Sequence, residues 1–388
     1  MRFIVDFFII GAYLITTTLH VSEGIRWLSM QNANIQWIKP NPMKQKIITL
    51  GTPKLDIKAP CAYARKHFGF TRLQTKICKS HLEMFPFVES AASLATKTCQ
   101  QLLHNRRWNC STVETAPTFK PDLLRATKEQ AFVYALSSAA LAHQIAKACA
   151  SGSIQMCSCG NKPRASSPKE FRWGGCPDNV KQGVRFSKRF IEAAEKLEKK
   201  DKKKNWYKYW LDEGIELTRW NKEISSINNH NSRVGRKAIG GTLKDACKCH
   251  GMSGSCTLKT CWKTLPPLAE IGNKLLTYYD NAKEVPYDKE TNNVQVSKIT
   301  FAKGNQLIYL SKSPNYCTRN ESLGSLGTVG RECNSTSQGL DSCHNMCCGR
   351  GYRTIREEKE EQCFCKYFHC CYVKCKTCRT VIEKQICN

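Results

Sequence analysis

The chain has 388 residues, and 60 Lys and Arg against 32 Asp and Glu give it a formal charge of +28. A charge of this size favours polyanionic partners. The 24 cysteines, an even number, predict a disulfide framework made in an oxidising compartment, which argues against nucleic acid and leaves sulfated glycans and anionic membrane surfaces.

The N-terminus reads "MRFIVDFFIIGAYLITTTLHVSEG", with Arg2 ahead of an apolar run from Phe3 to Ile15 and a plausible cut after Gly24. This pattern is typical of a secretory signal peptide over residues 1–24. An N-terminal membrane anchor is the alternative, although the run is shorter than the ~20 apolar residues that a spanning helix needs. We therefore expect a secreted chain in which residues 25–60 form an N-terminal extension. The sequons at Asn109, Asn320 and Asn334 predict glycosylation.

Residues 61–265 are predicted to form an α-helical domain. Apolar residues at helical spacing predict helices over residues 85–108, 127–150, 184–200 and 234–242. We expect these helices to be amphipathic and to form a bundle with disulfide-fastened loops. Thr127 and Gln130 are placed as a capping box at the start of the second helix. His143 in that helix is expected to be a packed histidine and not a catalytic one.

Residues 266–310 read as one helix, near 268–282, followed by a linker. Residues 311–388 hold twelve cysteines between Cys317 and Cys387 and are too short to build a large core, so disulfides must staple them. Alternating runs such as "CFCKYFHCCYVKC" predict the strands of a hairpin. The predicted fold is therefore α+β and disulfide-rich, with a helical N-terminal domain and a small cystine-rich β-hairpin C-terminal domain.

The stretch "CKCHGMSGSCTLKTCW", residues 247–262, permits three interpretations. As a nucleophile elbow it would make the chain a secreted serine hydrolase that uses Ser253. However, Ser255 stands where the last glycine belongs, and the α/β alternation that an elbow requires is missing. As a zinc site it would use Cys247, Cys249, His250 and Cys256, for which disulfide formation competes.

The third interpretation is a hairpin that presents a serine. Cys247 and Cys249 lie on one face of a strand, and Cys256 and Cys261 can lie on the returning strand. Nested pairs, Cys249 with Cys256 and Cys247 with Cys261, would then leave only "HGMSGS" as the tip. Its glycines permit backbone conformations that other residues resist, so Ser253 would be held out where a modifying enzyme reaches it.

These residues carry a family resemblance. The stretch is similar to the signature of the Wnt family of secreted glycoprotein ligands, C-K-C-H-G-x-S-G-S-C-x-x-x-T-C-W. Further matching stretches are "RRWNCS" from Arg106, "EQAFVYAL" from Glu129, "CSCG" from Cys157, "RWGGC" with "DN" from Arg172, "HNS", "VGR" and Ala from His230, and "CCGRGY" from Cys347. The resemblance covers nearly all of residues 61–387 and is strongest to the eleventh subgroup of the family.

The resemblance implies a ligand without enzymatic activity or a bound cofactor. Ser253 would carry a palmitoleate ester made by the acyltransferase Porcupine, and the acyl chain would fill a groove on the cysteine-rich domain of Frizzled receptors. Further implied partners are co-receptors, the carrier Wntless and the esterase Notum. The charge adds heparan sulfate proteoglycans of the extracellular matrix. The implied role is Wnt signalling in development, cell fate and cell polarity.

The resemblance also implies a disulfide pairing. Besides the two hairpin pairs, it pairs Cys99 with Cys110, Cys149 with Cys157, Cys159 with Cys176, Cys317 with Cys348, Cys333 with Cys343, Cys347 with Cys387, Cys363 with Cys378, Cys365 with Cys375 and Cys370 with Cys371, and it leaves Cys61 with Cys78.

Two receptor-binding tips follow from the resemblance. The first consists of Gly251, Met252, Ser253 and Gly254. The second spans residues 366–374 and uses Lys366, Tyr367, Phe368, His369, Cys370, Cys371, Tyr372 and Val373. His369 stands where the family usually has tryptophan, a frequent hot-spot residue, which puts the choice of receptor in question. Ordinary packing of the aromatic residues in a small domain is the alternative interpretation of the second tip.

Overall fold

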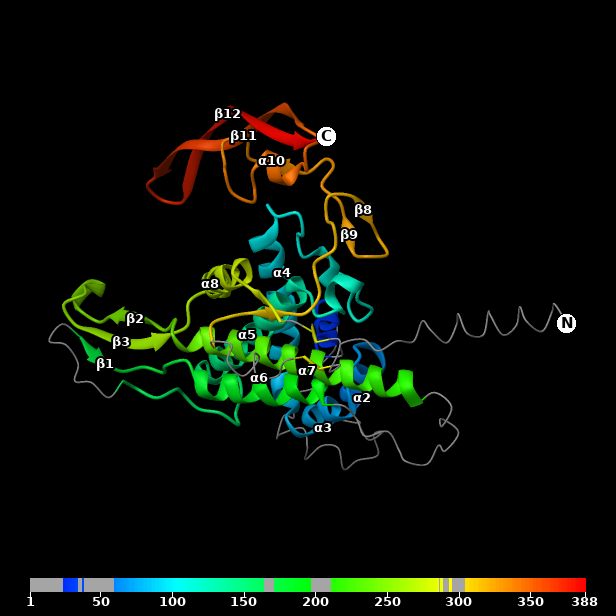
Figure 1. The fold of residues 1–388 in the computed structure, drawn as a ribbon. Coiled ribbons are helices and arrows are strands. Elements are labelled where there is room, and N and C mark those ends of the chain that lie inside the picture. Colours follow the sequence, from blue (N-terminus) through cyan, green and yellow to red (C-terminus); the bar gives the residue numbers. More distant parts are fainter. Residues whose placement is uncertain are drawn as a thin grey trace, which may run out of the picture. The chain divides into compact units, whose positions relative to one another are not determined.

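The computed structural model describes residues 24–33, 37, 59–163, 171–196, 211–285, 287–288, 293–294 and 304–388. They belong to two compact units, one of residues 1–102 and 111–313 and one of residues 103–110 and 314–388 (Figure 1). Residues 103–110, which the sequence places in the helical domain, thus belong to the second unit. Residues 1–23 of the predicted signal peptide and the lysine run at 199–204 lie outside the described residues.

The first unit is mainly helical. Its helices are η1 (Arg26–Asn32), α2 (Ala59–His67), α3 (Arg72–Ser80), η2 (Leu82–Met84), α4 (Phe85–Leu103), η3 (Ser111–Thr115), η4 (Pro121–Leu123), α5 (Lys128–Ala150), α6 (Val180–Glu195), α7 (Leu211–Gly240) and α8 (Leu268–Asp280). All the predicted helices are present. The last helix before the hairpin, α7, is much longer than the predicted 234–242. The prediction began too late because polar residues interrupt the amphipathic pattern upstream of Val234.

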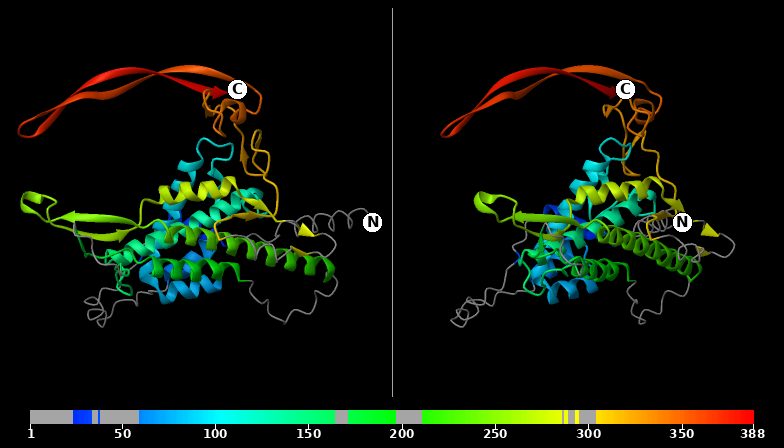
Figure 2. Two further views of the ribbon diagram at one scale, coloured as in Figure 1. Left: turned by 60° about the vertical axis from the view of Figure 1, so that its left-hand side comes forward. Right: turned by 90° about the vertical axis from the view of Figure 1, so that its left-hand side faces the viewer.

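Helix α5 is the centre of this unit and packs against α6, α7 and α8 (Figures 1 and 2). It is buried on all sides, so the prediction of an amphipathic helix was wrong here. Two glycines allow the close packing. A Cβ on Gly183 of α6 would lie 2.1 Å from the Ala142 carbonyl oxygen, and one on Gly235 of α7 would lie 1.9 Å from the Ala135 carbonyl oxygen.

The capping box predicted at the start of α5 forms only in part, and a complete one lies at the start of α3. Thr127 accepts a hydrogen bond from Gln130 N at 3.2 Å. The Gln130 side chain, however, accepts from Ala126 N at 2.7 Å and not from Thr127, so only half of the predicted capping box forms. The complete box lies at Thr71 and Gln74, at the start of α3. The stretch "TRLQ", Thr71 to Gln74, has the spacing of a capping box, and this spacing would have predicted α3, which the apolar periodicity did not reveal.

The first residues of the predicted N-terminal extension, 25–30, belong to the core, whereas residues 34–36 and 38–58 of that extension lie outside the described residues. In η1, Trp27, Leu28 and Met30 are fully buried, as is the preceding Ile25. The Trp27 ring meets the Phe190 ring of α6 edge-on, with centroids 5.8 Å apart. The start of the described chain is therefore fixed on α6.

Short strands complete the first unit. They are β1 (Arg172–Trp173), β2 (Lys244–Cys249), β3 (Lys259–Thr264), β4 (Lys283–Glu284), β5 (Tyr287–Asp288), β6 (Asn293–Val294) and β7 (Ile308–Tyr309). β2 and β3 form an antiparallel hairpin, and β1 joins the outer side of β3 in parallel. Figure 2 shows this hairpin reaching beyond the ends of the helices.

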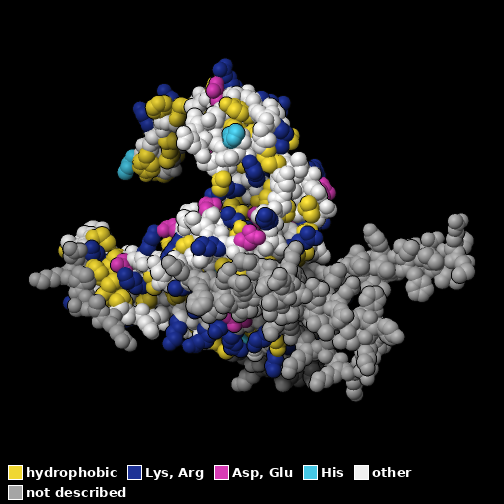
Figure 3. All heavy atoms as spheres, viewed as in Figure 1, with side chains coloured by type: hydrophobic (Ala, Val, Ile, Leu, Met, Phe, Trp, Pro, Cys, Tyr) yellow, Lys and Arg dark blue, Asp and Glu magenta, His cyan; other side chains and the backbone are white. Residues whose placement is uncertain are grey.

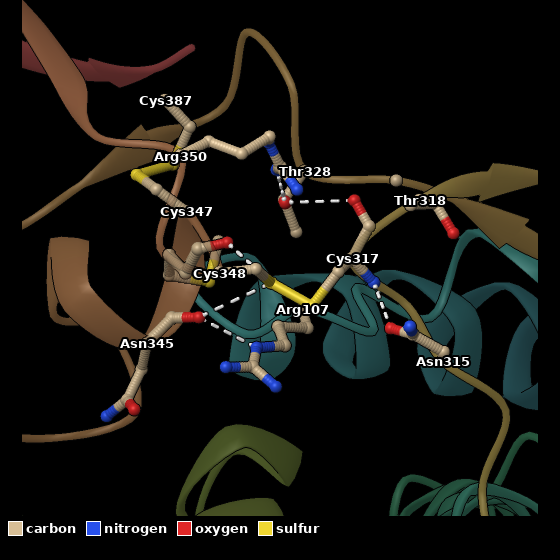
Figure 4. Close-up of a disulfide and its surroundings, with 12 residues drawn as sticks. Arg107, Asn315, Cys317, Thr318, Thr328, Asn345, Cys347, Cys348, Arg350 and Cys387 are labelled. Carbon is tan, nitrogen blue, oxygen red and sulfur yellow. Dashed lines mark hydrogen bonds between the residues drawn. A yellow bond between two sulfur atoms is a disulfide. The ribbon is translucent and has the colours of Figure 1, made fainter.

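The second unit is stapled, as predicted. It contains β8 (Arg319–Asn320), β9 (Ser325–Leu326), β10 (Glu332–Cys333), α10 (Cys343–Met346), β11 (Tyr352–Phe368) and β12 (Tyr372–Cys387). Its core cluster is Met346 together with four disulfide-bonded cysteines. Around the Cys317–Cys348 disulfide, Arg107 Nε donates to the Asn345 carbonyl at 2.7 Å (Figure 4). Disulfides thus replace much of the apolar core that a unit of this size lacks.

Strands β11 and β12 form one long antiparallel ribbon (Figure 2). Most of its side chains are exposed on both faces. Ion pairs join the strands near the base, with Arg356 Nε 2.9 Å from Glu383 Oε1 and Arg379 Nε 2.7 Å from Glu360 Oε1. An isolated two-stranded ribbon is marginally stable, and exposed ion pairs add little each. The disulfides Cys363–Cys378 and Cys365–Cys375 therefore supply the main constraint near the tip.

Candidate functional site

The β2–β3 hairpin is cross-linked twice, by Cys247–Cys261 and by Cys249–Cys256. Cys247 lies directly opposite Cys261 in the register, so the first disulfide joins facing residues. These are the nested pairs argued from the alternation of strand faces. The inner bond, Cys249–Cys256, encloses residues 250–255 as the tip. Each bond restricts the conformations of the tip in both the folded and the unfolded chain.

The tip is one tight turn, η6 (Met252–Gly254). Gly251 N donates to the Ser255 carbonyl at 2.8 Å, and Gly254 N donates to the Gly251 carbonyl at 3.0 Å. Ser253 has φ 55° and ψ 27°, the left-handed conformation, which non-glycine residues adopt at a penalty of roughly 1–2 kcal/mol. The surrounding disulfides and hydrogen bonds hold Ser253 in this conformation and present its side chain outwards.

Ser253 is exposed, and the neighbouring Met252 is 91% exposed. The side chains of His81, His143 and His230 make their hydrogen bonds to other residues than Ser253. The serine also sits between two strands of a hairpin and not between a strand and a helix, so a nucleophile elbow is absent from this site. The alternative zinc site is disfavoured because its cysteine sulfurs are bonded to each other or to Cys261.

The base of the hairpin is fastened to the helical unit. Asp178, just before α6, accepts hydrogen bonds at Oδ2 from Thr264 Oγ1 at 3.0 Å and from Leu265 N at 2.7 Å. Gly174 N donates to the Cys261 carbonyl at 3.0 Å. The Lys263 ammonium lies 5.3 Å from the centre of the Trp173 ring, within the range of a cation–π interaction. The residues of the "RWGGC" and "DN" motifs therefore hold the base of the hairpin in position.

The "HNSRVGRKA" stretch is likewise structural. The Asn231 side chain donates to the Ile308 carbonyl at 2.9 Å and accepts from Ile308 N at 3.0 Å, which extends the pairing of β7 onto α7. His230 Nε2 lies 2.9 Å from the Gln306 carbonyl oxygen, and burial lowers the pKa of His230. Arg236 pairs with Glu192 of α6 at 3.1 Å. Sequence inspection found this motif but did not reveal that it joins α7 to β7 and α6.

His143 is buried, as expected for a packed residue. Its Nε2 lies 2.9 Å from the Pro266 carbonyl oxygen, directly after the hairpin. Burial lowers its pKa below the ordinary 6.5, with the hydrogen bond to Pro266 opposing that shift. The side chain therefore links α5 to the segment that leads from β3 to α8.

The tip of the second unit carries exposed apolar side chains. Tyr367 is 70% exposed, and the Phe368 and Tyr372 rings stack with centroids 5.2 Å apart across the strands. The disulfide Cys370–Cys371 closes the turn, in which both cysteines have positive φ. Figure 3 shows hydrophobic side chains gathered at this end of the ribbon. Monomeric proteins rarely leave such a patch uncovered, and its exposure disfavours the interpretation of these aromatics as ordinary packing.

A basic hollow of about 440 Å³ lies between α3 and α6 of the first unit. Its lining includes Lys76, Arg185, Lys188, Arg189 and Lys196, together with Ser80 and the acidic Glu192. Figure 3 shows Lys and Arg side chains over these helices. Cations that face one hollow concentrate positive potential there, which favours a sulfated or phosphorylated partner.

The remaining sequence-predicted residues are located as follows. Asn320 and Asn334 are exposed, and Asn109 is half-buried. In each exposed sequon the Asn Oδ1 accepts from the hydroxyl two residues on, Ser322 at 2.6 Å and Thr336 at 2.8 Å. No described cysteine is free, and Cys99 and Cys110 are both disulfide-bonded. The other bonds are the pairs that the resemblance implies.

Comparison with known proteins identifies the class. The family model described as the Wnt family matches residues 66–388. Protein Wnt-11b-1 of Xenopus tropicalis is 44% identical over 324 residues, covering 82% of this chain and 87% of the relative. Protein Wnt-11 of Xenopus laevis is 38% identical over 388 residues, covering 98% and 99%. The chain belongs to the Wnt family.

Within that family the chain is Wnt-11-like, as the resemblance predicts. A solved structure, of human WLS in complex with WNT8A, contains a chain that is 33% identical, with a TM-score of 0.55 and coverage of 80% of this chain and 96% of that one. The predicted fold, a helical domain followed by a cystine-rich hairpin domain, is confirmed. Within the described residues, no helix combines the length and the apolar character that crossing a membrane requires.

Proposed function

We propose that this Wnt-family ligand is secreted with a palmitoleate ester on Ser253 and acts by binding the cysteine-rich domain of a Frizzled receptor. The observation that carries the proposal is the tip of the β2–β3 hairpin. Ser253 is exposed and held in the left-handed conformation by a turn that two disulfides close. Such a serine suits an acyltransferase, which needs an accessible hydroxyl.

The acyl chain would supply most of the contact at this tip. Burying about a dozen methylenes at ~0.8 kcal/mol each contributes on the order of 10 kcal/mol. Met252, 91% exposed, and Leu258, 53% exposed, extend the apolar surface around the ester. Gly251 and Gly254 complete the contact by keeping the turn narrow. A rigid hairpin is an advantage because little conformational freedom is lost on binding.

The tip at residues 366–374 is proposed as the second receptor contact. Tyr367 and Val373 lie opposite each other in the register and are 70% and 58% exposed. Exposed aromatic side chains on a disulfide-closed turn provide anchors of the kind found at binding hot spots. His369 is also exposed, and as a replacement for the family's usual tryptophan it is proposed to alter receptor preference.

Handling of the lipid requires further partners. We propose acylation by Porcupine, transport by Wntless and removal of the ester by Notum, with co-receptors joining the receptor complex and signalling directed to cell fate and polarity in development. The similarity to a chain in the structure of human WLS with WNT8A supports the carrier. Glycosylation at Asn109, Asn320 and Asn334 would accompany secretion. The basic hollow between α3 and α6 supports retention by heparan sulfate proteoglycans of the matrix.

The test is a comparison of Ser253→Ala with Ser255→Ala, because both serines are exposed on the same tip. Mass spectrometry of the secreted parent should find a C16:1 ester on the Ser253 peptide. Ser253→Ala should be secreted poorly and should lose at least tenfold in affinity for Frizzled cysteine-rich domains, whereas Ser255→Ala should keep both properties. Unmodified Ser253 in active material, or full receptor binding by Ser253→Ala, would contradict the proposal. Labelling of Ser253 by a fluorophosphonate would instead indicate a hydrolase.

A further inference from the structure

The sulfur atoms of the chain differ widely in their access to solvent. All 24 cysteines are disulfide-bonded, so the chain offers an oxidant no thiol. The other sulfurs are thioethers, and Met30, Met84 and Met346 are no more than 1% exposed. Met156 is 61% exposed and Met252 is 91% exposed. Among the described residues, Met252 is therefore the methionine that a dissolved oxidant reaches most easily.

Met252 is the first residue of the turn that presents Ser253. One peptide unit joins the two residues, so their Cα atoms are about 3.8 Å apart. Hydrogen bonds from Gly254 N to the Gly251 carbonyl at 3.0 Å and from Ser255 N to the Met252 carbonyl at 3.1 Å hold the backbone of this turn. The thioether is thus kept at the tip, beside the serine proposed to carry the ester.

The chemistry of a thioether suits this position only in its reduced form. Methionine is apolar and flexible and adapts to irregular apolar surfaces. Oxidation to the sulfoxide makes the side chain polar. The sulfoxide oxygen is a hydrogen-bond acceptor, and moving it from water into an apolar groove is unfavourable because it loses its partners there. An oxidised Met252 would therefore oppose insertion of the tip.

We propose that Met252 is an oxidation site at which hydrogen peroxide weakens the binding of the β2–β3 tip to its receptor. The sulfur lone pair forms a bond to one peroxide oxygen as the O–O bond breaks. The departing hydroxide takes the proton from the transferred oxygen and leaves as water. The thioether is oxidised by two electrons, and the peroxide is reduced. The effect on binding rests on the proposed function, whereas the oxidation itself does not.

The first experiment measures where the oxygen goes. The purified full-length protein is treated with hydrogen peroxide at neutral pH, and mass spectrometry of its proteolytic peptides follows each methionine with time. Met252 and the exposed Met156 should take up oxygen at least about tenfold faster than the buried Met84 and Met346. Oxidation of Met252 at the rate of the buried methionines would overturn the proposal.

The second experiment separates Met252 from the other exposed methionine. Binding to a Frizzled cysteine-rich domain is measured before and after peroxide treatment for the parent, Met252→Leu and Met156→Leu. Leucine is apolar and close to methionine in volume, so Met252→Leu should bind within about twofold of the untreated parent. After treatment the parent and Met156→Leu should each lose roughly tenfold in affinity, and Met252→Leu should lose less than about twofold. An equal loss in Met252→Leu and the parent would overturn the proposal.

The two measurements also keep this inference apart from the proposed function. If the untreated parent carries no ester on Ser253 or does not bind the receptor domain, the proposed function has failed, and the effect of oxidation on binding fails with it. If the parent is acylated and binds, and complete oxidation of Met252 leaves its affinity unchanged, only the present inference has failed.

Discussion

Substituting Gly235 with alanine tests the packing that supports the hairpin. A Cβ at this position would lie 1.9 Å from the Ala135 carbonyl oxygen and 2.6 Å from Ser138 Oγ. A carbon and a carbonyl oxygen in contact are normally about 3.3–3.6 Å apart, so α7 would have to move away from α5 by more than roughly 1 Å. The movement would also strain the hydrogen bond from Ser138 Oγ to the Ser232 carbonyl, which is 2.8 Å long.

The expected magnitude follows from two opposing terms. Overpacking a closely packed interior costs about 1–3 kcal/mol and occasionally more, whereas replacing a helical glycine with alanine contributes about 0.5–1 kcal/mol in favour of folding. Because the clash is with backbone atoms, we expect the upper part of the first range and a net destabilisation of about 2 kcal/mol. For a unit of this size that lowers the midpoint of thermal unfolding by roughly 3 °C.

Gly240 offers a matched control in the same helix. Nothing lies within 4 Å of a Cβ built there, so Gly240→Ala should leave the midpoint unchanged or raise it slightly. The assay is thermal unfolding of the purified proteins by circular dichroism at equal concentration, with the disulfides intact. If Gly235→Ala unfolds at the same temperature as Gly240→Ala or higher, the helices are not in the close contact described, and the reasoning fails.

Two further predictions concern charge. Burial holds the pKa of His143 below 6.5, so as the pH falls through that value the unfolded chain takes up the proton first. The contribution of His143 to stability is therefore complete above pH 6.5 and declines below it. His143→Gln should flatten the fall of the urea midpoint between about pH 7 and 5, and an unchanged slope would refute this. Reversing the charges of Lys188 and Arg189 in the basic hollow should lower the salt concentration that elutes the protein from heparin. The same reversal at Lys312 and Lys376, both exposed elsewhere, should have a smaller effect, and equal shifts would mean that only net charge matters.

The sequence predicted the hairpin at residues 247–261 well because its information is local. Strand alternation places Cys247 and Cys249 on one face, and the returning cysteines complete the nested pairs without reference to the rest of the fold. The same is true of the helix at α8, whose apolar spacing is regular. Features that depend on contacts distant in sequence were harder to predict. The periodicity of apolar residues does not show that Asp178 accepts a hydrogen bond from Leu265 N. Nor does it show that α5 is buried on all sides, because a helix rich in Ala and Ser appears polar on one face.

The structure separates the residues that define the family from those proposed to choose the receptor. The motif residues Asp178 and Asn231 make hydrogen bonds inside the first unit, and Gly235 is a packing position, so their identity is constrained by the fold itself. Met252 and His369 are exposed at the two tips, and replacing them would leave the cores of both units intact. If the tips bind the receptor as proposed, receptor preference would change through them while the scaffold stays the same. A family resemblance carried mostly by scaffold motifs specifies the fold and the presence of an exposed serine, whereas in the proposed function the chemistry of the tips decides what is bound.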